Sequence, residues 1–205
     1  TQGRVPKYGG TPGPLAPNFL SQQGPMARTV RDSAMMLQVV AGHDPRDPSS
    51  IREVPPDFVA ALDRDISGLR IGWTPDFGFV ASDAEVLEST SSAARVFEEL
   101  GCSLEESKLS LDLPFEPWWT LFIAASYGGS GDLLTSHPDD LTWYVRDTLE
   151  AGAKVTGAEY NMALGQRDRM IGQFGDELEQ FDLLVSPTMP VTAFPVDKLP
   201  VEIGG

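Results

Sequence analysis

The order strand, helix, strand over residues 69–109 constrains the fold more than any other feature of this chain. Leu69, Ile71 and Trp73 alternate with Arg70 and Gly72, as in a half-buried strand. A run with one apolar face follows, and residues 103–109 are predicted to be a second strand. Two strands joined by a helix of this length predict a right-handed βαβ unit, and therefore an α/β fold with an open, mostly parallel sheet and flanking helices.

The helix between these strands has predicted boundaries. Ser82 and Glu85 have the spacing of a capping box, in which each side chain bonds the other residue's backbone N–H. Gly101 stands where the helix should end, because glycine readily adopts the left-handed conformation of a helix terminus. A third short strand is predicted at residues 182–186, where Pro187 stops it.

A second helix is predicted over residues 29–41. Thr29 can cap it, and Gly42 stands where a left-handed residue ends a helix. Residues 43–48 then read as a turn that is rich in Asp and Pro. The apolar face is broad, so we expect the helix to be largely buried; it contains Val30, Ala34, Leu37 and Ala41.

The remaining segments complete the predicted organisation. Residues 1–23 are rich in Gly and Pro and should be extended. A short helix is expected in residues 57–68, with Phe58 and Leu62 inward. Residues 114–180 should form three helical pieces. We interpret residues 1–50 as an extended segment plus a buried helix. Residues 51–205 are interpreted as an α/β subdomain.

Charge and composition exclude some classes of function. The net charge is −15 and no basic stripe is present, so direct binding of nucleic acid is not expected. No signal peptide and no membrane-length apolar run is visible, and a single cysteine suits a reducing compartment. We therefore expect a cytoplasmic protein without membrane insertion, and a homodimer is an open alternative to a monomer.

Few side chains are candidates for chemistry. His43 and His137 lie in turn-like settings without a second histidine at helical spacing, so no metal is expected. No nucleotide-binding glycine motif occurs, so no cofactor is expected. Gly128–Gly131 is the nearest approach to a nucleophile loop, but it lacks a nearby base and is more typical of a helix break. Cys102 is predicted to be a packed, inert thiol.

Aromatic residues of the predicted helical region, residues 114–180, are candidates for a pocket wall. We select Trp119, Phe122, Tyr127 and Tyr144 as substrate-binding candidates, with ordinary core packing as the alternative interpretation.

Four stretches give the chain a family resemblance. "GRVP" at Gly3–Pro6, "GPMARTVRD" at Gly24–Asp32, "AGHDPRD" at Ala41–Asp47 and "FDLLVSPTMPVTAFP" at Phe181–Pro195 resemble the amidase signature family, in that family's order and at about its spacing. The resemblance implies an enzyme that cleaves non-peptide carboxylic amides. In such enzymes a serine attacks the carbonyl, a second serine in a cis peptide relays protons, a lysine is the base, and backbone N–H groups hold the oxyanion.

The resemblance also implies where the catalytic residues lie. In the family, the Gly/Ser-rich signature and the catalytic lysine precede the "GRVP" segment, so no residue of this chain inherits them. The chain is therefore interpreted as an internal or C-terminal part of an amidase that is inactive alone, with a small-molecule amide as the substrate of the full-length protein. The resemblance also implies that residues 1–50 pack on a catalytic core outside this chain, and that residues 51–205 are an α/β subdomain of an amidase.

Two alternatives stay open. One is the A subunit of a tRNA amidotransferase. It is disfavoured because Leu20-Ser21-Gln22-Gln23 stands where many members carry a "SLDxxGP" pattern. The other is a non-catalytic scaffold or interaction module that uses the same fold.

Overall fold

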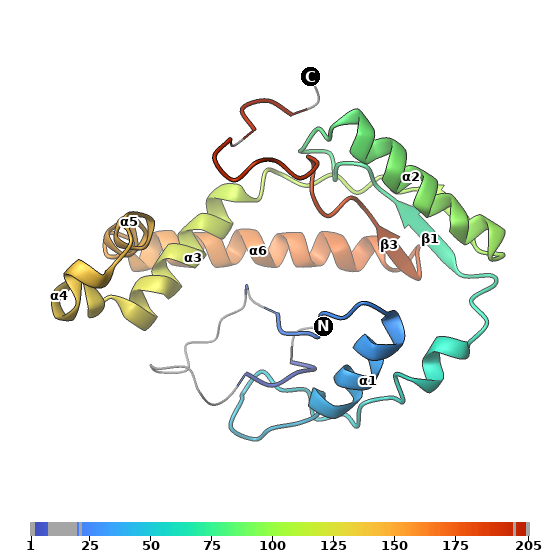
Figure 1. Ribbon diagram of the computed structural model, residues 1–205, viewed down its shortest axis with the longest axis horizontal. Coiled ribbons are helices and arrows are strands. Elements are labelled where there is room, and N and C mark those ends of the chain that lie inside the picture. The colour runs from blue at the N-terminus through green and yellow to red at the C-terminus, as the bar shows by residue number, and fades with distance from the viewer. Residues whose placement is uncertain (1–2, 8–19, 21, 199, 204–205) are drawn as a thin grey trace. The chain divides into compact units, whose positions relative to one another are not determined.

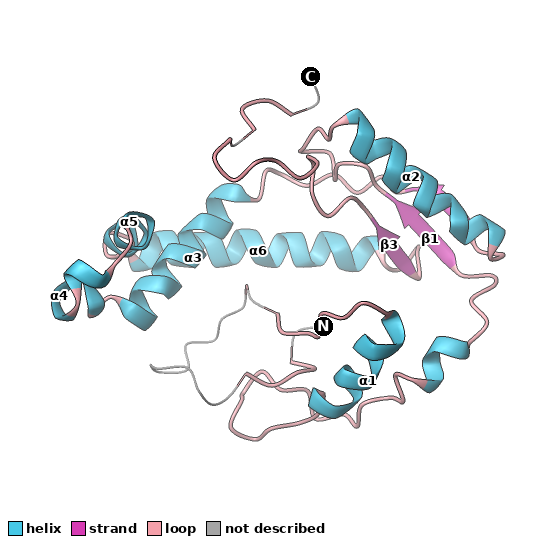
Figure 2. Cartoon of the chain, in the orientation of Figure 1, coloured by secondary structure: helices cyan, strands magenta, loops and turns pink. Residues whose placement is uncertain are grey.

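The computed structural model describes residues 3–7, 20, 22–198 and 200–203. Its elements, shown in Figures 1 and 2, are α1 (Val30–Val40), the 3-10 helix η1 (Ala60–Asp63), β1 (Arg70–Trp73), α2 (Ala84–Glu99), β2 (Ser103–Glu106), α3 (Phe115–Ser130), α4 (Leu133–Ser136), the 3-10 helix η2 (Pro138–Asp140), α5 (Trp143–Gly152), α6 (Gly157–Glu177) and β3 (Leu183–Val185). The segment that was expected to be extended, residues 1–23, lies mostly outside the described residues.

The chain divides into two compact units. Unit 1 comprises residues 1–65 and 118–163, and unit 2 comprises residues 66–117 and 164–205. Helices α3 and α6 each contribute residues to both units. The α/β layer predicted from the sequence is in unit 2, and unit 1 is helical.

A three-stranded parallel sheet forms the centre of unit 2. Its order is β2-β1-β3, and Ile71 in the central strand pairs with Leu104 on one side and Leu183 on the other. All three predicted strands are present within one to three residues of their expected bounds. Ile71 is fully buried, as is usual in the central strand of a parallel sheet, whose faces are covered. The predicted α/β fold is thus confirmed.

Helix α2 joins β1 to β2 and lies beside the sheet (Figure 1). It ends near Gly101, whose φ of 84° lies in the left-handed region, as predicted. The predicted capping box of Ser82 and Glu85 is wrong. The N-cap is Asp83, its side chain makes no capping bond, and Ser82 is buried instead.

The packing of α3 against α5 organises unit 1. Leu121, Ile123 and Leu149 are buried, and Gly152 lies directly against the backbone of Ile123. Because a side chain would collide there, glycine permits the close approach of the two helices. Helix α4 is a single turn between them.

The expectation that the helix at residues 29–41 is largely buried is wrong for this chain. Thr29 caps α1 as predicted, accepting from the Asp32 N–H at 3.1 Å. Ala34 is buried, but Val30 is 73% exposed and Val39 is 83% exposed. Unit 1 covers only one side of a helix that is apolar over a broader surface.

Two smaller expectations also fail. The short helix of residues 57–68 is the 3-10 turn η1, and Leu62 is exposed rather than inward. For Tyr144, which is 56% exposed at the start of α5, the alternative interpretation of core packing does not hold.

Candidate functional site

A backbone clip in unit 1 joins two of the stretches that carry the family resemblance. The Gly42 N–H donates to the Arg4 carbonyl at 3.0 Å, and the Ile51 N–H donates to the Gly3 carbonyl at 2.9 Å. Arg4 also forms an ion pair with Glu53 at 3.5 Å. We define the clip as residues 3–7 and 42–51. It gives a physical reason for these distant stretches to occur together.

Asp47 is the centre of the clip. Its carboxylate accepts from the Lys7 backbone N–H at 2.8 Å, and from both the backbone N–H and the hydroxyl of Ser49. The residue is only 6% exposed, so these bonds compensate for the loss of its hydration. Sequence reasoning assigned Asp47 to a polar turn and missed its long-range partner, Lys7, because the spacing of the two gives no signal.

The same turn contains a second carboxylate with a perturbed pKa. Hydrogen bonds from Arg46, first from its guanidinium and then from its backbone N–H, lower the pKa of Asp44 from 3.8 to about 2. At Asp47, the Ser49 hydroxyl and then the Lys7 N–H lower the pKa. Both carboxylates are charged at neutral pH and act here as structural acceptors.

Aromatic rings gather on one face of α3. The Trp118 and Phe122 rings stack with centroids 5.3 Å apart, and Trp119 lies 5.8 Å from Phe122. Trp118 and Phe122 are about two-fifths exposed, whereas Trp119 is more enclosed. Partly exposed, offset rings of this kind can receive a flat apolar group. We call Trp118, Trp119 and Phe122 the aromatic face of α3.

The structure brings together only part of the predicted substrate-binding set. Trp119 and Phe122 share the aromatic face of α3, while Tyr127 lies farther along the helix, beside Gly131 and Gly152. Tyr144 makes its ring contact with Trp143 on α5, with the ring centroids 5.7 Å apart.

Trp118 belongs to this aromatic face, although the selected substrate-binding set did not include it. Trp118 stands four residues before Phe122, so the two side chains lie on one face of α3. That spacing was visible in the sequence and could have identified the residue.

The other residues considered for chemistry lie in exposed turns, in the core or at the end of a helix. His43 and His137 are exposed turn residues, each next to a serine hydroxyl. Cys102 is buried, and its thiol donates to the Ile66 carbonyl at 3.2 Å. Ser130 is the last residue of α3, so the Gly128–Gly131 cluster marks a helix end, as expected. Among the described residues, no helix combines the length and apolar character that crossing a bilayer requires.

A family model described as Amidase matches residues 1–202. This chain belongs to the amidase family. It is 32% identical over 175 residues to an acylamidase of Rhodococcus erythropolis, an alignment that covers 84% of this chain and 37% of that protein. It is 33% identical over 219 residues to the A subunit of the glutamyl-tRNA(Gln) amidotransferase of Rubrobacter xylanophilus, covering 95% of this chain and 45% of that protein.

Solved amidase structures share the fold. The crystal structure of a bacterial aryl acylamidase of the amidase signature family superimposes with a TM-score of 0.80 at 27% identity, covering 98% of this chain and 44% of that one. This amidase chain thus spans less than half the length of the relatives that it matches.

Proposed function

We propose that this chain is part of an enzyme that hydrolyses non-peptide carboxylic amides, with its catalytic serines and lysine upstream of residue 1. In this proposal one serine attacks the carbonyl carbon, a serine in a cis peptide relays protons, and the lysine is the base. The likeness to an aryl acylamidase over 98% of the chain is the observation that carries the proposal.

The aromatic face of α3 would supply part of the substrate pocket. Its partly exposed rings offer a flat apolar wall for the acyl or leaving group of an amide. Tyr127 and Tyr144 are also in unit 1, and we keep them as candidates for other parts of the pocket, away from the aromatic face. The substrate class that fits such a wall best is an amide with an aryl group.

The exposed side of α1 supports the placement of the catalytic part outside this chain. Val30, Met35, Met36 and Val39 are all more than half exposed. An apolar helix face of this kind normally packs against protein. We propose that residues 1–50 pack on the catalytic core of the longer enzyme, and that the enzyme works in the cytoplasm.

The A subunit of a tRNA amidotransferase is the second candidate, favoured by the 33% identity to such a protein over 219 residues. It predicts glutaminase activity that depends on partner proteins and tRNA. A free amidase would hydrolyse simple amides without either, so one assay with and without partners separates the two.

The central test compares the 205-residue chain with the longer protein on a panel of aryl and alkyl amides. We expect turnover and labelling by a serine-directed fluorophosphonate only in the longer protein. The isolated chain should show neither, because it lacks the nucleophile and the base together. Turnover by the isolated chain that survives repurification, or stoichiometric labelling of Ser130, would overturn the placement of the active site.

A further inference from the structure

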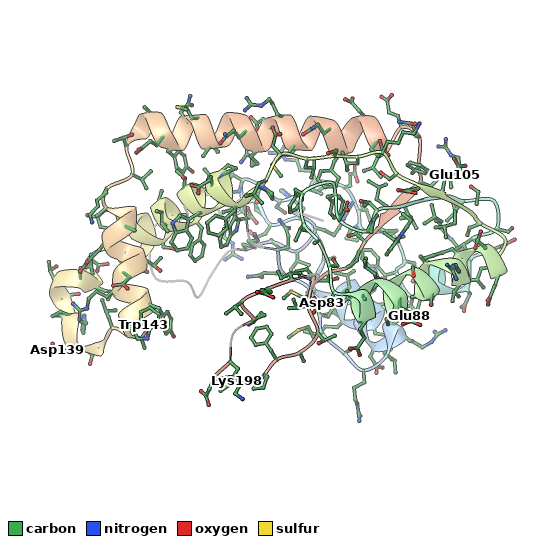
Figure 3. All side chains as sticks on the ribbon, turned by 90° about the horizontal axis from the view of Figure 1, so that it is seen from above. Asp83, Glu88, Glu105, Asp139, Trp143 and Lys198 are labelled. Carbon is green, nitrogen blue, oxygen red and sulfur yellow. The ribbon has the colours of Figure 1, made fainter. Side chains whose placement is uncertain are left out.

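A groove of about 380 Å³ lies within unit 2, between α6 and the segment that leads into α3. This segment runs antiparallel to α6 (Figures 1 and 3). The Ser107 hydroxyl donates to the Glu177 carboxylate at 2.6 Å, and the Gln173 amide donates to the Ser110 carbonyl at 3.3 Å. The groove therefore has two walls that are tied together by hydrogen bonds.

The groove is lined by apolar side chains and by charged side chains of both signs. Leu113, Pro117 and Met170 supply apolar surface, while Asp112, Arg169 and Asp176 supply charge. Within residues 22–198, none of these three charged side chains forms an ion pair or a side-chain hydrogen bond. Opposite charges thus line one groove without neutralising one another.

The spacing of the charges selects the shape of a ligand. Arg169 and Asp176 are seven residues apart on α6, which corresponds to roughly 10 Å along the helix axis. A simple anion or a simple cation would engage only one of them. A linear molecule with a carboxylate at one end and an ammonium at the other can engage both.

We propose that this groove binds a linear zwitterion, an ω-amino carboxylate or a short peptide, with its carboxylate at Arg169 and its ammonium at Asp176. The volume lies within the range of small-molecule sites, roughly 300–1,000 Å³. This inference does not depend on the proposed amidase activity.

The first test is an NMR titration of the 205-residue chain with ω-amino acids from 3-aminopropanoate to 8-aminooctanoate. We expect an optimum chain length and shifts at residues 166–176. Hexanoate and hexylamine should each bind up to about fivefold more weakly than the matching zwitterion, because each loses one exposed ion pair. Glycine oligomers of equal length distinguish a peptide ligand from an ω-amino acid. Binding that is independent of length, or equal for the singly charged compounds, would overturn the proposal.

Variants then localise the site. Arg169→Gln and Asp176→Asn should each weaken binding of the optimum zwitterion by up to about fivefold. Gly172→Phe should block the groove, since a Cβ there meets open space on the groove wall. Asp168→Asn, on the same helix but outside the groove, is the matched control and should leave binding unchanged. An equal loss with Asp168→Asn would mean that general charge, not the groove, attracts the ligand.

Discussion

Thr156 and Glu159 satisfy each other's backbone at the start of α6. The Glu159 carboxylate accepts from the Thr156 N–H at 2.8 Å, and the Thr156 hydroxyl accepts from the Glu159 N–H at 3.2 Å. This is a reciprocal capping box, and it fixes where the longest helix of the described chain begins.

Thr156→Ala should lower the free energy of unfolding by about 1 kcal/mol, because the start of α6 loses its side-chain cap. Urea denaturation followed by far-UV circular dichroism measures the change. Thr148→Ala is a matched control, since the Thr148 hydroxyl only bonds back to the Tyr144 carbonyl within α5. Equal losses in the two variants would argue against a capping role.

Two glycine-to-alanine substitutions should change the free energy of unfolding in opposite directions. Gly152→Ala places a Cβ 2.2 Å from the Ile123 carbonyl oxygen, so it should destabilise unit 1 by about 1–3 kcal/mol. Gly165→Ala in α6 meets nothing within 4 Å and should stabilise the helix by about 0.5–1 kcal/mol. Thermal denaturation of both variants checks the pair, and a gain of stability in Gly152→Ala would contradict the packing of α3 against α5.

Asp47→Asn should open the backbone clip. An amide cannot accept all three hydrogen bonds that the carboxylate receives, so we expect a loss of about 2 kcal/mol. Hydrogen exchange should accelerate at the Lys7 and Ser49 amides. Protection that stays unchanged at Lys7 would show that the clip does not depend on Asp47.

Acid should weaken the turn around Asp44. The pKa of Asp44 in the folded protein is about 2, below the ordinary value of 3.8. Its contribution to the free energy of unfolding is therefore fully present when the pH is above 3.8, and it is lost as the pH falls towards 2. Asp44→Asn should therefore show a smaller decline of stability between pH 3.8 and pH 2 than the unaltered protein. High salt should reduce this difference between the two proteins, because the Arg46 side chain of the ion pair is exposed. Identical pH profiles for both proteins would refute this role.

Trp119→Ala in the longer enzyme should change the ratio of kcat/KM for an aryl amide to that for an alkyl amide, lowering it severalfold. The ratio is informative because a loss of folded protein alters both constants equally. Phe194→Ala, an exposed aromatic position in unit 2, is the control. An unchanged ratio together with lower stability would assign Trp119 to ordinary packing.

The sheet could be predicted because its signals are local. Alternation around Ile71 and the apolar run before Pro187 specify strands without knowledge of their partners. The glycine at position 101 marked a helix end for the same reason. Capping was predicted at the wrong site: Ser82–Glu85 and Thr156–Glu159 share the same spacing, and only tertiary packing, which buries Ser82, distinguishes them.

Long-range relationships gave no comparable signal. The partners of Asp47 and Glu177 are Lys7 and Ser107, which lie 40 and 70 positions away. The exposure of α1 was equally unpredictable, because an apolar face shows that a helix can be buried but not which segment covers it. The substrate-binding residues stay a prediction until the longer enzyme is assayed.

The strand order has a consequence for synthesis on the ribosome. The central strand β1 needs β3, and the residues that meet there, Arg70 and Asp182, are 112 positions apart. A nascent chain therefore carries β1 with one edge unpaired until residues 183–185 have been translated. Open strand edges template the pairing of one chain with another. This amidase should then depend on chaperones, or on fast translation of residues 107–182, to escape aggregation while it is made.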